Sequence, residues 1–310
     1  MSYAQRTTPK NLLIFYGWPS CFNSAVNGWD LNKVAEDMAR YDVIVLGAGL
    51  QDPAHGDHAN TVAIIAKIKA LKPAVSIFGY VTANQSYATF RTQAMAWDAM
   101  AVAGIFCDEA GYDFGVTRAA LNEKLGLLHA LKLLAFVNAW NPDHVLGVVN
   151  DPGFPNATFN PDQVPSLVRK VDWYLFESLS VNDSAYPGGL EPQAQYVARM
   201  VKARRYAERV QMASVGIIDP ESAATFGFLW VAGVMGAMDA VGNADPSYGA
   251  SSATTRWYDR PQDWPWGNYD EPSPIVPSPA DATILRRFLV GGSVRFSLNW
   301  TTGAGAIDRL

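Results

Sequence analysis

Acidic side chains stand at the ends of three short apolar runs. One run ends in Asp108 and Glu109, a second ends in Glu177 and a third ends in Asp239. A carboxylate that is buried without a partner costs several kcal/mol, so acids in such positions need a structural or chemical reason. A single one commonly caps the following helix or pairs with a basic residue. Three of them on separate predicted strands indicate a catalytic or binding site.

Two of these carboxylates have the chemistry that cleaves a glycosidic bond. Such hydrolysis places one carboxylic acid and one ionised carboxylate on either side of the bond. We predict Asp108 as nucleophile or base, and Glu177 as general acid because the apolar run Trp173–Phe176 leads into it. Glu109 is the third predicted catalytic residue, and it reaches the site only if the backbone turns after Asp108. Two charges this close leave the assignment between Asp108 and Glu109 open.

Aromatic and amide side chains follow other predicted strands and suit a sugar ligand. Flat aromatic faces match the apolar faces of sugar rings, although Trp and Tyr are also ordinary packing residues. An amide at a strand end can bind a hydroxyl group, although Asn is equally a turn former. The predicted substrate-binding residues are Tyr16, Trp18, Tyr80, Asn138, Trp140 and Asp239.

A metal-dependent hydrolase is a weaker hypothesis, and it depends on one loop. His55 and His58, together with Asp52 and Asp57, could hold a metal ion. The spacing is common and the loop is polar, so we predict no metal and no cofactor. The sequence also lacks a phosphate-binding loop, a dinucleotide fingerprint and a nucleophile elbow.

Eight apolar runs of strand length must position these residues, and they alternate with helical segments. The runs are Leu12–Tyr16, Val43–Leu46, Val75–Val81, Gly104–Cys107, Leu133–Asn138, Trp173–Glu177, Gln211–Ile217 and Met235–Asp239. Nearly continuous apolar strands are typical of a parallel sheet that is buried on both faces. Eight of them predict a (β/α)8 TIM barrel, whose active site lies at the C-terminal ends of the strands. A doubly wound open sheet is the alternative, but no glycine-rich phosphate turn follows the first strand.

The chain is predicted as a single barrel domain over residues 1–310 with long βα loops. A Trp/Pro-rich loop insertion at 242–279 is long and aromatic, which indicates a functional loop and not a disordered one. We expect it to fold over the barrel and to add at least one of its tryptophans to the pocket wall. A last helix near Ala280–Leu289 and an added strand at Val294–Trp300 are expected to complete the chain.

Composition limits the partners of the protein. Hydrophobic residues make up 49% of the chain and the net charge is −5, so a large core is available and a nucleic-acid surface is not expected. A local basic run that includes Arg199, Lys202 and Arg205 is interpreted as a solvated helix face. No apolar leader begins the chain, and no run reaches the ~20 apolar residues of a membrane span. We therefore expect no membrane contact and a soluble protein, either cytoplasmic or exported or assembled by another route. The oligomeric state is not predicted.

The strand ends also resemble a known enzyme family. Phe15–Pro19, Ile105–Glu109 and Phe176–Glu177 resemble the corresponding strand ends of the spherulin-4 family of glycoside hydrolases. They are similar, more distantly, to those of the endo-α-1,4-polygalactosaminidase family. The resemblance covers the barrel in the order of its elements, and it implies a (β/α)8 fold that acts on amino-sugar exopolysaccharides. The catalytic residues that it implies are Asp108, Glu109 and Glu177.

The leading hypothesis is therefore a glycoside hydrolase that cleaves a polysaccharide, with amino-sugar polymers as one candidate substrate class. The alternative is a non-catalytic barrel that binds a glycan or has a structural role in a larger surface or phage-type assembly. Two acids that face each other across a short gap favour the enzyme. Acids locked in salt bridges, or a plugged barrel, favour the binding protein.

Overall fold

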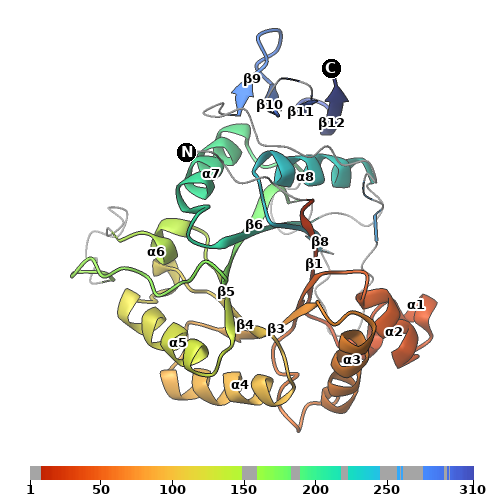
Figure 1. Ribbon diagram of the computed structural model, residues 1–310, viewed down its shortest axis with the longest axis vertical. Helices are drawn as coiled ribbons and strands as arrows, with labels where there is room; N and C mark the ends of the chain where they lie inside the picture. Colours follow the sequence, from red (N-terminus) through yellow and green to blue (C-terminus); the bar gives the residue numbers. More distant parts are fainter. Residues whose placement is uncertain are drawn as a thin grey trace.

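Eight parallel strands close into a barrel in sequence order, and the last strand pairs with the first (Figure 1). The strands are β1 (Lys10–Phe15), β2 (Val43–Leu46), β3 (Ser76–Thr82), β4 (Gly104–Asp108), β5 (Leu134–Asn138), β6 (Trp173–Asn182), β7 (Gln211–Ile217) and β8 (Ala240–Ala244). The (β/α)8 prediction is confirmed, and the open sheet is excluded. The computed structural model describes residues 8–148, 159–182, 189–217, 223–244, 257–258, 260, 275–289, 292 and 294–310.

Helices surround the barrel on its outer side (Figure 1). They are α1 (Ser24–Asn27), α2 (Leu31–Met38), α3 (His58–Leu71), α4 (Tyr87–Ala99), α5 (Arg118–Ala130), α6 (Pro142–Leu146), α7 (Gln193–Tyr206) and α8 (Ala223–Met235), with single turns η1 (Pro19–Cys21) and η2 (Tyr112–Phe114). Local sequence explains where several begin, since Ser86 and Thr117 accept backbone N–H groups of the first turns of α4 and α5. Among the described helices, none is long and apolar enough to cross a membrane.

The interior of the barrel is filled by alternate residues of the strands. This inner shell consists of Leu12, Ile14, Val43, Val45, Phe78, Phe106, Phe136, Trp173, Leu175, Ala213, Val215, Ala240 and Ala244. Successive strand residues point to opposite faces, so the next inward positions after Phe106, Phe136 and Leu175 are two residues further on. Those positions hold Asp108, Asn138 and Glu177. Strand alternation alone therefore places three polar side chains together above an apolar interior.

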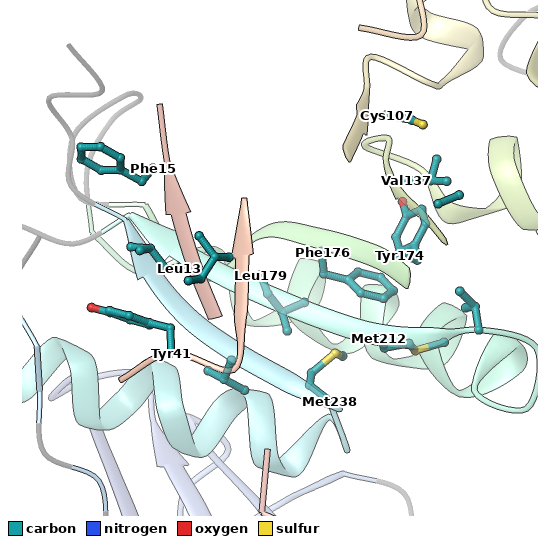
Figure 2. Packing of buried hydrophobic residues seen from close by; sticks show 14 of the residues in the cluster. Leu13, Phe15, Tyr41, Cys107, Val137, Tyr174, Phe176, Leu179, Met212 and Met238 are labelled. Carbon is teal, nitrogen blue, oxygen red and sulfur yellow. The ribbon is translucent and has the colours of Figure 1, made fainter. Parts of the chain in front are cut away.

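The opposite faces of the strands pack beneath the helices. Leu13 and Phe15 of β1, Phe176 of β6 and Met212 of β7 belong to one buried cluster with apolar residues of the helices (Figure 2). Burying a side chain of this size contributes ~1.5–3 kcal/mol. The strands are apolar on both faces because both faces are covered, and this holds the strand ends in place.

The eighth strand begins later than the sequence analysis predicted. Helix α8 runs to Met235, a left-handed residue (Ala237, φ 56°) follows, and β8 starts at Ala240. Asp239 therefore precedes its strand. Its Oδ2 accepts the backbone N–H of Met212 at 2.8 Å, and its carbonyl oxygen accepts the backbone N–H of Lys10 at 2.8 Å. Asp239 therefore lies at the N-terminal ends of β7 and β1.

The prediction that Asp239 binds substrate beside Asp108 and Glu177 is wrong, because Asp239 lies at the opposite end of the barrel. The physical reason is that α8 is apolar on nearly all sides, as a helix packed between a barrel and a second sheet must be. The end of a buried helix and a buried strand have the same apolar pattern over five residues.

A small antiparallel sheet follows the barrel. Its strands are β9 (Val276–Pro277), β10 (Ile284–Phe288), β11 (Val294–Asn299) and β12 (Ala304–Arg309), in the order β12-β11-β10-β9. The expected helix at Ala280–Leu289 is wrong, since Ile284–Phe288 alternates between buried and part-exposed residues as a strand does. The added strand near Val294 is confirmed. Strands β11 and β12 pack against α8 (Figure 1).

The described residues of the Trp/Pro-rich insertion that follow β8 lie outside the barrel. The rings of Trp257 and Tyr41 lie 5.1 Å apart, and the guanidinium of Arg260 lies over Trp257. Tyr258 stacks on Phe226 of α8 at 4.7 Å. Tyr41 lies two residues before β2, so Trp257 packs on the outer layer and does not form the expected pocket wall. The other two tryptophans of the insertion, at 264 and 266, lie outside the described residues, and residues 242–244 belong to β8.

Candidate active site

Asp108 and Glu109 both reach the C-terminal end of the barrel because the backbone turns between them. Asp108 ends β4 in an inward position, and Glu109 has a left-handed backbone (φ 55°). This conformation costs about 1–2 kcal/mol for a residue with a side chain, so it is held by its surroundings. The turn brings Glu109 Oε2 to 2.7 Å from Oγ1 of Thr82, which donates to it from the end of β3.

A single amide joins two of the three predicted catalytic acids, Asp108 and Glu177. Asn138 ends β5, between β4 and β6, and its Nδ2 donates to Asp108 Oδ1 at 2.8 Å and to Glu177 Oε2 at 3.0 Å. Because both bonds share one nitrogen, the two accepting oxygens lie no more than ~6 Å apart. Asn138 is buried, whereas both acids keep part of their surface exposed. The arrangement is a carboxylate pair with a fixed spacing and access to solvent.

The two acids differ in how many groups bind their ionised forms. Asp108 accepts three hydrogen bonds, from the Tyr80 hydroxyl at 2.8 Å, the Asn138 amide and the Glu109 backbone N–H at 2.9 Å. Burial raises the pKa of Asp108, and these donors oppose the rise. Among the described residues, Glu177 has one donor, the Asn138 amide. Burial raises its pKa, and the nearby charge of Asp108 raises it further. Glu177 is therefore the better proton carrier of the two.

Arg199 lies behind Glu177, where the sequence analysis predicted only a solvated helix face. That interpretation is wrong for Arg199, whose side chain is buried on the barrel-facing side of α7. Its guanidinium donates to the carbonyl oxygens of Glu177 at 2.6 Å and Ser178 at 2.9 Å. The signal was present in the sequence, because Arg199 falls at helical spacing between the apolar Tyr196 and Ala203.

Two predicted aromatic residues cover the inner shell beside the acids. Tyr80, which donates to Asp108, makes an edge-to-face contact with Tyr16 at 5.4 Å. Burial and the neighbouring carboxylate charges raise the pKa of Tyr80 far above its ordinary value, so it acts as a hydrogen-bond donor. Both tyrosines keep part of their surface exposed. They form a floor of aromatic surface next to the carboxylate pair.

Two predicted tryptophans are more exposed than these tyrosines. Trp140 follows β5, is 51% exposed, and has the Arg199 guanidinium 4.7 Å from its ring centroid. Trp18 follows β1, is 37% exposed and meets the ring of His55 edge-on at 5.4 Å. Exposed rings of this size are suitable surfaces for stacking a sugar.

The loop with two histidines is organised by its own hydrogen bonds. His58 Nδ1 lies 2.8 Å from the carbonyl oxygen of Leu50, and His55 Nδ1 accepts the N–H of Asp57 at 3.1 Å. Asp57 itself accepts from the backbone N–H of Ser20 and the side chain of Asn60. Among the described residues, no group of three or more His, Cys, Asp or Glu side chains could hold a metal ion. The geometry therefore gives the metal hypothesis no support in this part of the chain.

Comparison with known proteins identifies shared architecture only. No family model and no curated protein matches the sequence, so the resemblance to the spherulin-4 family stays a prediction. A variant of the glycoside hydrolase domain of PelA from Pseudomonas aeruginosa is 15% identical over 77% of this chain and 96% of that chain, with a TM-score of 0.46. A variant of AmyP in complex with maltotriose is 10% identical over 82% of this chain and 70% of that chain, with a TM-score of 0.49.

Barrels with other chemistry are equally similar. Malate synthase from Haloferax volcanii is 13% identical over 81% of this chain and 72% of that chain, with a TM-score of 0.46. Glycoside hydrolases are thus among the structural neighbours, but unrelated reactions occur on the same fold. The chemistry of this protein has to be argued from its own side chains.

Proposed function

We propose that this protein is a glycoside hydrolase that cleaves a polysaccharide with Asp108 and Glu177. The observation that carries the proposal is the Asn138 amide, whose single nitrogen donates to both carboxylates and so keeps the two accepting oxygens, at the ends of β4 and β6, within ~6 Å of each other. Glycosidases that retain anomeric configuration have carboxyl groups ~5–5.5 Å apart, and inverting enzymes need ~6.5–9.5 Å for a water molecule. The spacing supports a retaining mechanism.

The hydrogen bonds assign a role to each acid. Three donors favour the ionised form of Asp108, which suits a nucleophile that attacks the anomeric carbon. In the described part of the chain Glu177 has one donor, and its pKa is raised by burial, so it suits the acid that gives a proton to the leaving oxygen. After bond cleavage, the same group in its ionised form can take a proton from the incoming water. Asn138 keeps the two carboxylates in the same relative position during both steps.

The same geometry argues against a purely binding or structural role. A barrel that only binds a glycan could hold its acids in salt bridges. Within the described part of the chain, neither Asp108 nor Glu177 forms an ion pair with a basic side chain. Two partly buried carboxylates without a salt-bridge partner cost stability, and such a cost is expected where function requires it.

The surroundings of the acids support an amino-sugar polymer as substrate. Glu109 is a third carboxylate at the same end of the barrel, and its negative charge would complement the ammonium group of a de-acetylated amino sugar. Tyr16, Trp18 and Trp140 offer aromatic faces for further sugar units. This substrate class agrees with the one that the family resemblance implies.

The proposal is tested by measuring release of reducing ends from amino-sugar polymers with different degrees of acetylation, and from neutral glucans. We expect the parent protein to cleave at least one amino-sugar polymer. Asp108→Asn and Glu177→Gln should each lower kcat by about 10³-fold or more, because each removes a group that acts in the transition state. The stereochemistry of the first product, followed by NMR, should show retention.

Asp42→Asn is the matched control, because Asp42 is a half-buried acid at the other end of the barrel. It should keep the parental kcat. Near-parental rates in both active-site variants, each shown to be folded, would mean that these acids are structural. Binding of the polymers without cleavage would instead support the glycan-binding alternative.

A further inference from the structure

We propose that Arg199 is a positioning residue for Glu177. Its guanidinium holds the irregular backbone of β6 that directs this carboxylate towards Asp108, and it connects the acid to the exposed ring of Trp140. The inference rests on the proposed function, because that function requires Glu177 to transfer a proton.

Strand β6 is irregular immediately after Glu177. Its pairing with β7 is regular up to Glu177, and the register then shifts before Asn182. Ser178 has a left-handed backbone (φ 46°), which costs a residue with a side chain about 1–2 kcal/mol. A register shift also takes carbonyl groups out of the ladder between the strands. This segment needs support from outside the sheet.

Arg199 supplies that support in a form that only arginine can provide. Its two terminal nitrogens donate to two consecutive carbonyl oxygens, Glu177 at 2.6 Å and Ser178 at 2.9 Å. These carbonyls lie on either side of the Cα atom of the strained residue. A planar guanidinium with a rigid fork can bind both at once, whereas a lysine ammonium offers a single point of attachment. The Arg199 side chain is 6% exposed, so the two bonds are shielded from water.

The charge of Arg199 is directed at the site and is not neutralised by a salt bridge. It forms no ion pair with a carboxylate within the described part of the chain, and its Nε has no partner there. Glu177 faces Asp108 from β4, Tyr80 from β3 and Arg199 from α7. Burial raises the pKa of Glu177, the Asp108 charge adds to the rise, and the Arg199 charge opposes it. Arg199 therefore limits how tightly Glu177 keeps its proton.

The Arg199 guanidinium also packs against the ring of Trp140, a predicted substrate-binding residue. The Arg199 carbon Cζ lies 4.7 Å from the ring centroid of Trp140, and this ring is 51% exposed. A cation packed on an aromatic face fixes the plane of the ring. A sugar stacked on Trp140 would thus be held in a constant position relative to Glu177. Arg199 therefore fixes the position of Glu177 relative to the Trp140 ring on which a sugar would stack.

The experiment compares Arg199→Met and Arg199→Lys with Arg205→Met as control. Arg205 lies on the exposed side of the same helix and pairs with Asp143 at 3.3 Å. The pKa of Glu177 is measured by ¹³C NMR of glutamate labelled at Cδ, with the signal assigned through Glu177→Gln. We expect Arg199→Met to raise the pKa of Glu177 and to lower kcat at least ten-fold.

Arg199→Lys separates charge from geometry. It should keep the pKa of Glu177 closer to the parental value while restoring kcat only in part, because one ammonium cannot hold both carbonyls. Arg205→Met should leave both quantities unchanged. An unchanged pKa of Glu177 in Arg199→Met, or complete recovery of kcat in Arg199→Lys, would overturn the proposal.

A second variant keeps the test valid if Arg199→Met unfolds. Ser178→Gly removes the penalty of the left-handed backbone, so Arg199→Met should lose less stability in that background than in the parent. Equal losses in the two backgrounds, or failure to fold in both, would mean that Arg199 supports the barrel as a whole. The NMR titration needs no substrate. If the parent cleaves nothing but the pKa shifts as expected, the positioning role stands and the proposed hydrolase function fails.

Discussion

Both ends of this barrel carry buried or half-buried carboxylates, but the two ends use them differently. At the N-terminal end, Asp42, Asp172 and Asp239 stand immediately before β2, β6 and β8. Each accepts a backbone N–H from the strand next to it, in β1, β5 and β7, at distances of 2.7, 2.9 and 2.8 Å. These acids join neighbouring strands.

At the C-terminal end, the carboxylates accept hydrogen bonds from side chains. Asp108 binds the Tyr80 hydroxyl and the Asn138 amide, Glu177 binds the same amide, and Glu109 binds the Thr82 hydroxyl. Within the ranges that the structure describes, the backbone donor to Asp108 comes from the next residue along the chain. An acid saturated by the backbone of another strand stabilises the sheet. An acid held by side chains, with part of its surface exposed, remains available for chemistry.

The largest expected effect comes from substituting an acid at the N-terminal end, which should lower the stability of the fold but leave kcat unchanged. Asp172 is fully buried and also accepts the N–H of Arg169 at 2.7 Å, with the His129 ring 3.0 Å away. Asp172→Ala leaves these donors without an acceptor, so we expect a loss of about 3 kcal/mol in the free energy of unfolding. Urea denaturation measures this loss. The kcat of the folded fraction should stay parental, and a large fall in kcat would contradict the division between the two ends.

A smaller effect is expected from removing the Tyr80 hydroxyl, which donates to Asp108. Burial raises the pKa of Asp108 and the hydrogen bond from Tyr80 opposes the rise, so Tyr80→Phe should raise this pKa further. Asp108 must be ionised to act, so the ascending limb of the pH profile of kcat/KM should move to higher pH. We expect kcat/KM at the optimum to fall about ten-fold, which corresponds to one hydrogen bond to a charged group.

Tyr206→Phe is the control for that measurement. Its hydroxyl donates to Asp143 at 2.6 Å, which is the same kind of bond on the outer surface of the barrel. The pH profile of Tyr206→Phe should match the parent. A profile that is unchanged in Tyr80→Phe as well would show that Asp108 does not need this donor.

The smallest effect concerns the stability cost of the active-site acid. Because the pKa of Glu177 is raised in the folded protein, the folded state binds more protons than the unfolded state between pH ~4.3 and the raised value. Stability is therefore lost as the pH rises through this window. Glu177→Gln removes the charge, so its Tm should exceed the parental Tm at pH 7, and the difference should shrink below pH ~4.3.

Calorimetry at the two pH values measures this difference. Glu123→Gln, on the exposed side of α5, is the control and should change Tm little at either pH. A lower Tm for Glu177→Gln at pH 7 would mean that Glu177 stabilises the fold, as the acids at the N-terminal end do.

Much of the barrel followed from the sequence because its pattern is local. Seven of the eight predicted strands overlap the observed strands closely, since each is a short apolar run between polar segments. The errors occurred where two structures share one pattern. Met235–Asp239 continued a buried helix, and Ala280–Leu289 contained the inner strand β10, where the alternate buried positions of this segment, Leu285, Arg287 and Leu289, include an arginine. Arg199 was misplaced because its charge was given more weight than its helical spacing.

The sequence by itself determined that Asp108 and Glu177 lie together. The two residues continue the inward alternation of β4 and β6, and a (β/α)8 barrel brings the C-terminal ends of its strands to one face. Only the tertiary structure decided how these groups are used. The spacing of the acids depends on the Asn138 amide, the direction of Glu177 on a guanidinium from α7, and the position of Asp239 on where β8 begins. Alternation is a property of neighbouring residues, whereas these three features depend on contacts between residues at least 22 positions apart in the chain.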